Sequence, residues 1–424
     1  MARAKWERKR GHMSTSSRRF ASVGVLLVVM AAVALLAFFA AGCGGDETTS
    51  TEATSSASAG GPVAVDEWDL SMLSVLSGPV AFAGEPALWG AQYAAEQINA
   101  SGGIRGVPVK ITGVDTAFDP AKAASAMTTA TENGLIVLGP MDGPSAAAAA
   151  PVFVDAQVPV VAALTSPEER ADALPYGAAY MIDDGPPTAW AVDQWLTLQP
   201  EIKKLVVFWD PSDPANKIEM EETVKSFEAA GATEAGAIEV KAGQLDMGTP
   251  AVKALSYDAD GYVCLVRMEE FAKLAVELND RGMKDGWRLY APFAAFGSDL
   301  LNLAKGSLEG AYIWNKLDIT SQDPAWLEFV DAYKADHAGQ EPVVPPVLGY
   351  YDTVNALKQI FEKYEITGDP AKLAEERQKI TEALADGTTY DGLQFPWKWQ
   401  DGQMEGSAFL YQVENGKFVM VAEM

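Results

Sequence analysis

The sequence is poor in the side chains from which most catalytic and metal sites are built. Its 424 residues include two histidines, His12 and His337, and two cysteines, Cys43 and Cys264. It contains no Gly-x-Ser-x-Gly turn, no His-Glu-x-x-His pair, no closely spaced cysteines and no Asp-x-Asp-x-Asp-Gly loop. A nucleophile with its base, or a bound metal ion, needs such sets. The sequence therefore predicts a protein that is not an enzyme and that holds no metal or cofactor.

Positive charge is scarce as well. The chain has 32 lysines and arginines against 58 aspartates and glutamates. Residues 1–43 hold seven of the basic residues and one acidic residue, so the rest of the chain has 25 against 57 and a net charge of −32. A nucleic-acid backbone requires clustered lysine and arginine, so this composition argues against a nucleic-acid partner. An acidic surface also keeps a domain in solution and away from anionic lipid.

An uncharged run at residues 21–42 follows a basic head and leads through small residues into Cys43, "AFFAAGCGGD". This is the form of an export signal, and its end resembles the cleavage site of a bacterial lipoprotein, with Ala40 where leucine is more usual. A diacylglycerol on Cys43 would supply the two chains that stable anchoring requires. The alternative is an uncleaved anchor, since about 20 apolar residues can span a membrane. Both interpretations, the cleaved lipoprotein signal and the uncleaved anchor, place the folded part outside the cytoplasmic membrane.

We therefore expect residues 1–43 to be a lipoprotein signal peptide that includes the lipidation cysteine, on a protein held at the outer face of the cytoplasmic membrane. Residues 44–62 are rich in Ser, Thr, Ala and Gly and have almost no apolar content. Such a segment cannot pack, and we expect a flexible tether.

From residue 63 onward, segments with strand-like patterns alternate with segments of helical periodicity. Apolar strand patterns lie at 68–76, 107–114, 135–139 and 158–164, and a second series lies at 205–209, 236–240, 261–266 and 288–292. Three short strand patterns, 393–399, 408–413 and 417–422, close the chain. This alternation predicts an α/β protein with two doubly wound lobes. Cys264, inside the apolar run "GYVCLV", is expected to be a small buried core residue.

An ordered series of motifs makes the pattern more specific. "LSGPVAFAG", "INASGGIRG" and "DTAFDPAKA" are followed by "GPMDGPSAAAAAP", "LTSPEE" and "YDGLQFPWKWQDGQ". Over about residues 66–424 the chain resembles the leucine/isoleucine/valine-binding protein family, the type I solute-binding proteins of ABC importers. The resemblance implies two lobes joined by three crossover strands, with a ligand cleft that closes by hinge bending. Lobe 1 would comprise 63–185 and 317–395, and lobe 2 would comprise 186–316 and 396–424.

The same resemblance implies partners: a small-molecule ligand, and a membrane permease with cytoplasmic ATPases. We expect a monomer. The ligand class stays open between an amino acid, an amide and a small organic acid. A lipid-anchored sensor that uses the same cleft to signal to a membrane partner is the alternative role.

In the family, the ligand's carboxylate is held by backbone N–H groups and hydroxyls at the mouth of a helix and in an "ATSPEL" loop. The resemblance places Gly143 at the family's binding serine, so that hydroxyl is missing, and Asp142 lies beside it. Thr165 matches the threonine of the loop, and Ala163 can offer backbone groups. For Ser145, at the start of the helix, an N-cap role and a ligand contact remain equally open.

The lobe 2 half of the site departs from the family further. Arg267 lies where the family often has a tyrosine, Phe293 lies near its ammonium-binding glutamate, and Pro214 lies near another tyrosine. Phe82, beside the first turn, is a candidate for the cleft wall.

These changes allow three interpretations, because an α-amino acid needs a positive partner at its carboxylate and a negative one at its ammonium. In the first, polarity is reversed: Arg267 takes a carboxylate while Asp142 meets a donor such as an amide or ammonium. In the second, Asp142 and Arg267 pair across the closed cleft and the ligand is mostly neutral. In the third, Asp142 is an exposed turn acid and Arg267 a solvated strand-end charge.

Overall fold

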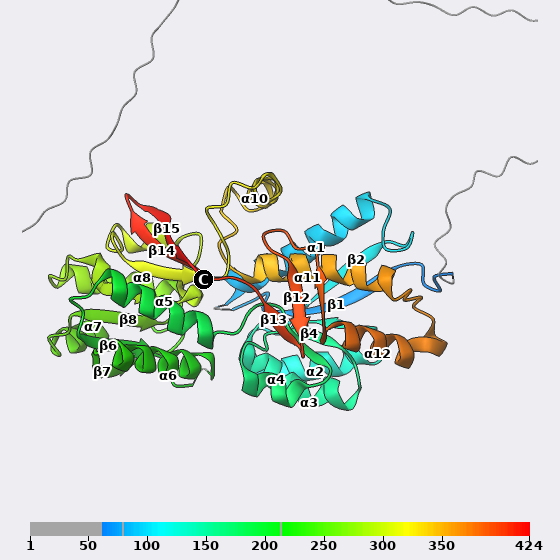
Figure 1. Ribbon diagram of the computed structural model, residues 1–424, viewed down its shortest axis with the longest axis horizontal. Coiled ribbons are helices and arrows are strands. Elements are labelled where there is room, and N and C mark those ends of the chain that lie inside the picture. The colour runs from blue at the N-terminus through cyan, green and yellow to red at the C-terminus, as the bar shows by residue number, and fades with distance from the viewer. Residues whose placement is uncertain (1–61, 79, 213) are drawn as a thin grey trace, which may run out of the picture. The chain divides into compact units, whose positions relative to one another are not determined.

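The computed structural model describes residues 62–424 except 79 and 213 (Figure 1). Of residues 214 and 215 it describes the backbone and not the side chains. By its internal contacts the chain divides into two units, 1–58 and 59–424. The predicted signal peptide, Cys43 and nearly all of the predicted tether lie outside the described residues. Within the described part, no helix combines the length and apolar character needed to cross a membrane.

The first sheet is fully parallel and has the order β2-β1-β3-β4-β5. Its strands are β1 (Trp68–Ser74), β2 (Val109–Asp115), β3 (Val137–Leu138), β4 (Val160–Ala162) and β5 (Gly177–Ala179). Its helices are α1 (Ala81–Ala100), α2 (Pro120–Thr131), α3 (Gly143–Asp155) and α4 (Pro167–Ala173), joined later in the chain by α10 (Pro324–Asp336), α11 (Pro346–Lys363) and α12 (Leu373–Ala383). We call this assembly lobe 1.

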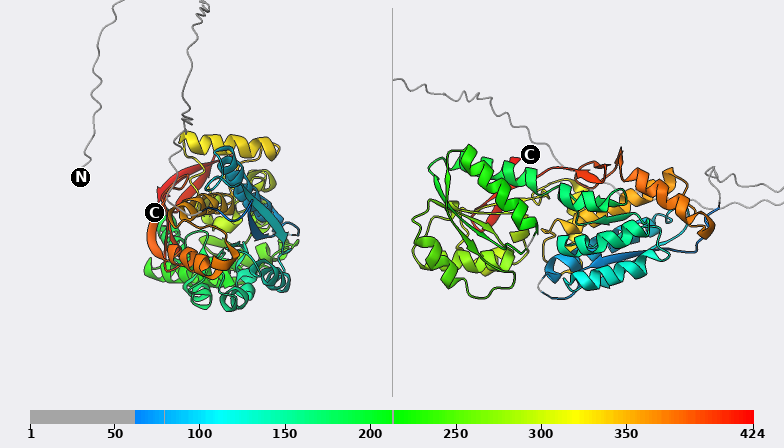
Figure 2. Two further views of the ribbon diagram at one scale, coloured as in Figure 1. Left: turned by 90° about the vertical axis from the view of Figure 1, so that its right-hand side faces the viewer. Right: turned by 90° about the horizontal axis from the view of Figure 1, so that it is seen from below.

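Helix α1 packs closely along α11 because Gly90 has no side chain. A β-carbon on Gly90 would lie 2.0 Å from the carbonyl oxygen of Val347. This contact joins α11, which comes late in the chain, to α1, the first helix of lobe 1. Figures 1 and 2 show α11 among the elements of the first sheet.

The second sheet, with the order β15-β14-β10-β9-β8-β6-β7, combines a parallel part with an antiparallel edge. Its strands are β6 (Lys204–Trp209), β7 (Thr233–Glu239), β8 (Gly261–Leu265), β9 (Leu289–Ala291), β10 (Tyr312–Asn315), β14 (Phe409–Glu414) and β15 (Lys417–Glu423). Its helices are α5 (Gly185–Leu198), α6 (Pro214–Ala229), α7 (Gly248–Leu255), α8 (Met268–Asp280) and α9 (Leu300–Ala304). We call this assembly lobe 2.

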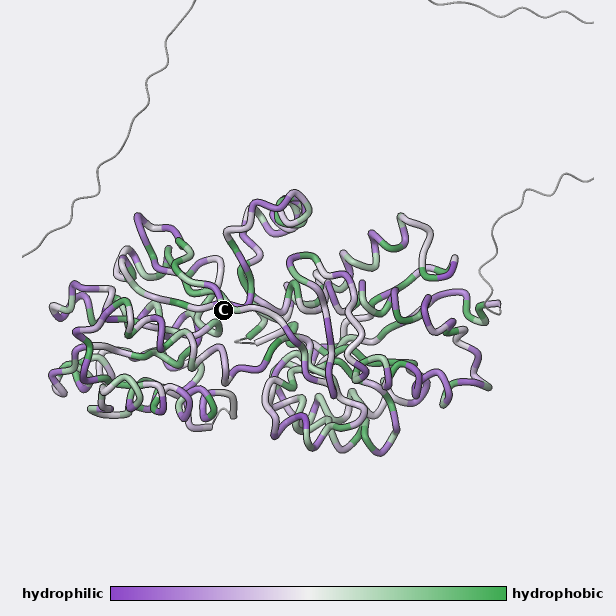
Figure 3. Tube along the Cα trace, in the orientation of Figure 1, coloured by the Kyte–Doolittle hydropathy of each residue, from purple (hydrophilic) through white to green (hydrophobic). Residues whose placement is uncertain are grey.

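Strands β3, β4, β5, β8, β9 and β10 are buried along their whole length. Hydrophobic and hydrophilic residues alternate along the helices of both lobes (Figure 3). Cys264 lies in β8, is fully buried, and burial raises the pKa of its thiol. The predicted α/β class with two doubly wound lobes is confirmed, because each lobe is built on parallel strands joined by helices.

A small antiparallel sheet lies between the end of α12 and β14. It contains β11 (Asp386–Tyr390), β12 (Trp397–Gln400) and β13 (Gln403–Glu405). The N–H of Ala179 donates to the carbonyl of Gly402 at 2.8 Å, and Trp399 Nε1 donates to the carbonyl of Ala179 at 2.7 Å. Residues 396–405, which the sequence analysis placed with lobe 2, thus lie against β5 of lobe 1.

The chain passes between the two sheets three times. It crosses after β5, after β10 and between β13 and β14. Trp397, next to the last crossing, is 2 % exposed and Trp399 is fully buried, so both pack in the core.

Candidate functional site

A cavity of about 820 Å³, open solvent at its mouth included, lies between the two lobes. Its lining residues follow the carboxyl ends of β1, β2, β3, β4 and β5 on one side and of β8 and β9 on the other, and residues 344–346 at the start of α11 complete the lining. Ligands of open α/β sheets bind in this position, since the strand ends and helix N-termini meet there.

Seven of the nine predicted binding residues line this cavity: Phe82, Asp142, Gly143, Ala163, Thr165, Arg267 and Phe293. Ser145 does not; it is fully buried behind the mouth of α3. Pro214 begins α6, and its side chain is outside the described residues. A ligand contact by any of these residues stays a prediction.

The N-terminus of α3 is capped by Asp142 and not by Ser145. The Ser145 N–H donates to Asp142 Oδ1 at 3.0 Å, which is the N-cap arrangement. Of the two roles left open for Ser145, the N-cap role is therefore excluded, because the cap lies three residues earlier. Asp142 is only 8 % exposed, so it is not the exposed turn acid of the third interpretation.

Glu169, in the first turn of α4, places its carboxylate on the loop that holds Thr165. Its Oε2 accepts the Thr165 N–H at 3.0 Å and the Ser166 hydroxyl at 3.2 Å, while the Glu169 N–H donates back to Ser166 Oγ at 3.1 Å. Its Oε1 lies 2.9 Å from the position that a β-carbon on Gly143 would occupy. The Glu169 carboxylate therefore fills the space where a side chain at residue 143 would begin.

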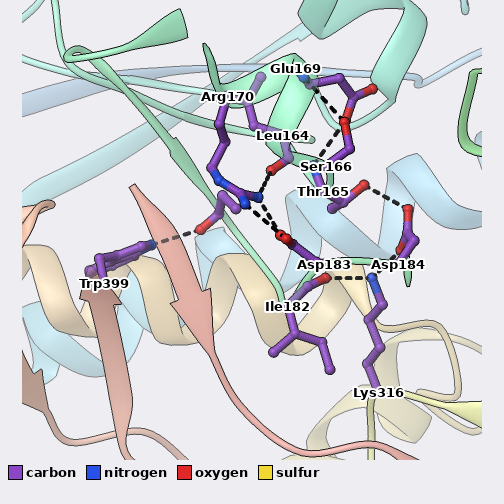
Figure 4. Close-up of polar contacts among 11 residues, drawn as sticks. Leu164, Thr165, Ser166, Glu169, Arg170, Ile182, Asp183, Asp184, Lys316 and Trp399 are labelled. Carbon is purple, nitrogen blue, oxygen red and sulfur yellow. Dashed lines mark hydrogen bonds and ion pairs between the residues drawn. The ribbon is translucent and has the colours of Figure 1, made fainter. Parts of the chain in front are cut away.

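Two buried ion pairs support the floor of the cavity (Figure 4). Arg170 binds both carboxylate oxygens of Asp183 and donates to the carbonyl of Leu164 at 3.1 Å. Lys316, which follows β10, pairs with Asp184 and donates to the carbonyl of Ile182 at 2.8 Å.

Asp184 connects this support to the cavity itself. Its Oδ2 accepts the Thr165 hydroxyl at 2.7 Å while its Oδ1 meets Lys316, and the side chains of Asp184 and Lys316 are each 3 % exposed. Lys316 comes from the crossing after β10 and Asp184 from the crossing after β5. The pair thus joins two of the three crossings directly beside Thr165.

The lobe 2 wall is aromatic and cationic. The Lys316 Nζ lies 4.3 Å from the centre of the Phe293 ring, and Phe293 meets Trp314 edge-on at 5.2 Å. Arg267, at the N-terminus of α8, is partly buried and places its guanidinium 5.1 Å from the ring centre of Phe118, a lobe 1 residue. Such cation–π contacts are favourable within about 6 Å. Arg267 is therefore not the solvated charge of the third interpretation, which the structure contradicts for both residues.

The lobe 1 floor includes a neutral phenol surrounded by carboxylates. Tyr180 stacks on Tyr350 at 4.6 Å and donates its hydroxyl to the carbonyl of Met141 at 3.2 Å. Burial raises the pKa of Tyr180 well above its usual value, and the nearby negative charges of Asp184, Asp142 and Glu169 raise it further. Tyr180 thus stays a hydrogen-bond donor at neutral pH. Among residues 62–424, with the stated gaps, no three His, Cys, Asp or Glu side chains are grouped to hold a metal ion.

Comparison with known proteins agrees with this architecture. A family model described as periplasmic binding protein matches residues 67–417. The chain belongs to the periplasmic binding protein family. The resemblance drawn from the motifs, to the branched-chain amino acid members of type I, is confirmed.

Individual relatives of this periplasmic binding protein are distant in sequence, but the matches extend over nearly the whole length of each relative. The Leu/Ile/Val/Thr-binding protein of Salmonella typhimurium is 24% identical over 349 residues, 81% of this chain and 90% of the relative. A leucine-binding protein structure from Thermotoga maritima superposes with a TM-score of 0.71 at 20% identity, covering 84% of this chain and 98% of that one. An ABC transporter solute-binding protein from Rhodopseudomonas palustris, in complex with 3,4-dihydroxybenzoic acid, gives a TM-score of 0.73 at 17% identity and covers 85% and 98%. These relatives are named as binding proteins and not as enzymes.

Sequence reasoning missed two charged residues that line this periplasmic binding protein's cleft, Glu169 and Asp184, and the buried Lys316 that pairs with Asp184. Glu169 had a signal, because Ser166 followed three residues later by glutamate is the capping-box pattern. Asp184 had a weaker signal, because it is the second of two adjacent acids after an apolar segment. The signal for Lys316 was its position directly after the buried strand β10. None of these local patterns indicates that the three side chains lie around Thr165.

Proposed function

We propose that this periplasmic binding protein captures a small organic solute in the interlobe cleft and delivers it to a membrane permease driven by cytoplasmic ATPases. The observation that carries the proposal is the cavity itself, since residues from both lobes line it at the carboxyl ends of parallel strands. Arg267 and Phe118 meet across it, so a ligand that contacts both lobes would favour their approach. Family membership supports the same role.

For the ligand we propose an amino acid, an amide or a small organic acid with an apolar body. Apolar side chains dominate the cavity wall, among them Phe82, Phe118, Met141 and Phe293. Polar side chains are few. The uncharged ones are Thr165 and Tyr180, and the charged ones are acids on the lobe 1 side and Arg267 on the lobe 2 side. This distribution is compatible with the reversed-polarity interpretation and with the pairing of Asp142 and Arg267 across the cleft. One relative is named as a leucine-binding protein and another is in complex with 3,4-dihydroxybenzoic acid, which supports both an amino acid and a small organic acid as candidates.

We further propose that a lipidated Cys43 anchors the protein at the outer face of the membrane. The support is the sequence alone: an uncharged run after a basic head that ends in small residues at Cys43. Mass spectrometry of the N-terminal peptide from the native membrane tests this directly. A peptide that begins at Cys43 and carries acyl chains is expected, and an intact peptide spanning residues 40–50 would contradict the proposal.

A thermal-shift screen of the full chain in detergent, over amino acids, amides and small acids, tests solute binding. A ligand at about 100 times its dissociation constant adds about 2.7 kcal/mol to the free energy of unfolding. Calorimetry then compares Arg267→Ala with Arg281→Ala, a control at the other end of α8 that pairs with Glu277 at the surface. We expect Arg267→Ala to lower the affinity for the ligand found in the screen, and Arg281→Ala to leave it unchanged.

Uptake of that ligand by cells with and without the protein tests the importer role. Loss of uptake on deletion supports delivery to a permease. Binding without any effect on uptake would contradict delivery and favour the sensor.

A further inference from the structure

The backbone donors that an anionic ligand would use at lobe 1 are already bonded to carboxylates of the protein. The N–H groups at a helix N-terminus commonly bind a ligand's carboxylate or phosphate. Here Asp142 accepts the N–H of Ser145 at 3.0 Å, and Glu169 accepts the N–H of Thr165 at 3.0 Å. A ligand carboxylate would have to displace these groups to reach the same donors.

Glu169 also replaces the side chain that is missing at Gly143. Its Oε1 lies 2.9 Å from the position of a β-carbon on Gly143. In the family loop "ATSPEL", the position of Glu169 is a leucine, and the position of Gly143 is the binding serine. The two departures are therefore in contact, and together they exchange a neutral hydroxyl for a carboxylate at one point of the cavity wall.

The charges around this point are strongly one-sided. Asp142, Glu169 and Asp184 all line the lobe 1 side of the cavity. The nearest cations are bound in place beneath it, Arg170 by Asp183 and Lys316 by Asp184. The remaining charged lining residue, Arg267, comes from lobe 2 and lies on Phe118. Like charges in a partly buried site repel strongly, and opposite charges attract.

We propose that the ligand's head group at lobe 1 is a cationic nitrogen, an ammonium or an amidinium, held by Glu169 with Asp142 beside it. The ligand's apolar body lies against Phe82 and Phe293, and a carboxylate, where the ligand has one, faces Arg267. This assignment rests on the proposed function, because it names the class of solute for the same cleft. It also selects reversed polarity over the pairing of Asp142 with Arg267.

Matched probes of opposite charge test the proposal on the full chain in detergent. Benzamidine is compared with benzoate, and leucinamide with 4-methylpentanoate, by thermal shift and calorimetry. The expected result is that benzamidine and leucinamide bind at least tenfold more tightly than their anionic counterparts.

Variants then assign the preference to Glu169. Glu169→Gln, which keeps the shape of the side chain, is expected to weaken the cationic probes at least tenfold. Glu168→Gln, the exposed neighbour in the same turn of α4, is the control and should change affinity less than twofold. The double variant Glu169→Ala with Gly143→Ser exposes the Thr165 N–H and restores the hydroxyl, so its preference should shift toward the anions.

The outcomes distinguish a failure of the proposed cationic head group from a failure of the proposed solute-binding function. Tighter binding of benzoate and 4-methylpentanoate to the unaltered protein would overturn the cationic head group and leave solute binding intact. A failure of all four probes would also overturn the proposed class, while solute binding is judged separately by the broad screen and by uptake. Equal effects of Glu169→Gln and Glu168→Gln would refute the role of Glu169.

Discussion

Replacing Lys316 with methionine is expected to destabilise the protein far more than the loss of one surface charge would. The Lys316 ammonium pairs with Asp184 and donates to the carbonyl of Ile182, and both charged side chains are 3 % exposed. Methionine preserves most of the aliphatic stem but leaves the Asp184 carboxylate buried without its cation, while the Thr165 hydroxyl still donates to its Oδ2. The cost is therefore that of an uncompensated buried charge.

The magnitude follows from this burial. Removing one partner of a buried ion pair typically costs about 3–5 kcal/mol. Combining Lys316→Met with Asp184→Asn removes the stranded charge while an amide oxygen can still accept from Thr165, so most of the loss should be recovered. Lys273→Met is the matched control, because Lys273 forms an exposed i,i+4 pair with Glu269, and such pairs contribute about 0.3–0.5 kcal/mol.

Urea unfolding followed by tryptophan fluorescence measures these differences. With a slope of about 3 kcal/mol per M, Lys316→Met should lower the midpoint by at least about 1 M, and Lys273→Met should barely change it. The reasoning is refuted if Lys316→Met costs no more than the control, or if the double variant is as unstable as the single one.

Two further predictions concern Asp352 and Gly139. Burial raises the pKa of Asp352 well above its usual value, so the folded state holds this proton more tightly and stability falls as pH rises from about 4 through the raised pKa. Relative to the unaltered protein, Asp352→Asn should therefore become more stable as pH rises above about 4, by up to about 1.4 kcal/mol per pH unit until the raised pKa is passed. A pH-independent difference in urea midpoints would contradict this. At Gly139, φ is +80° and a β-carbon would lie 2.0 Å from the carbonyl oxygen of Leu73. Gly139→Ala should lower the unfolding midpoint clearly more than Gly106→Ala, whose φ is +86° with nothing within 4 Å; equal losses, about 1–3 kcal/mol from backbone strain alone, would show that the close approach to Leu73 is unimportant.

The position of the cleft was predictable because it depends on local patterns. Each strand pattern ends in a turn, and parallel strands bring their carboxyl ends to one edge of a sheet. Gly143 and Thr165, which the family resemblance placed at one site, follow two such ends, β3 and β4, and line the same cavity. The role of Ser145 stayed open because both Asp142 and Ser145 suit an N-cap, and only the backbone conformation identifies Asp142 as the cap of α3.

The sequence by itself thus determined the two α/β lobes and the carboxyl ends of their strands as the place for a cleft. These follow from hydrophobic periodicity and turn residues, which act over a few positions along the chain. That residue 143 is a glycine where the family has a serine follows from the resemblance of the motifs and not from periodicity. Only the tertiary structure decided which charges meet there. Glu169 takes the space beside Gly143, and Lys316 reaches Asp184 from 132 residues away. Electrostatic pairing depends on distance and burial in space, and neither is written in the local pattern.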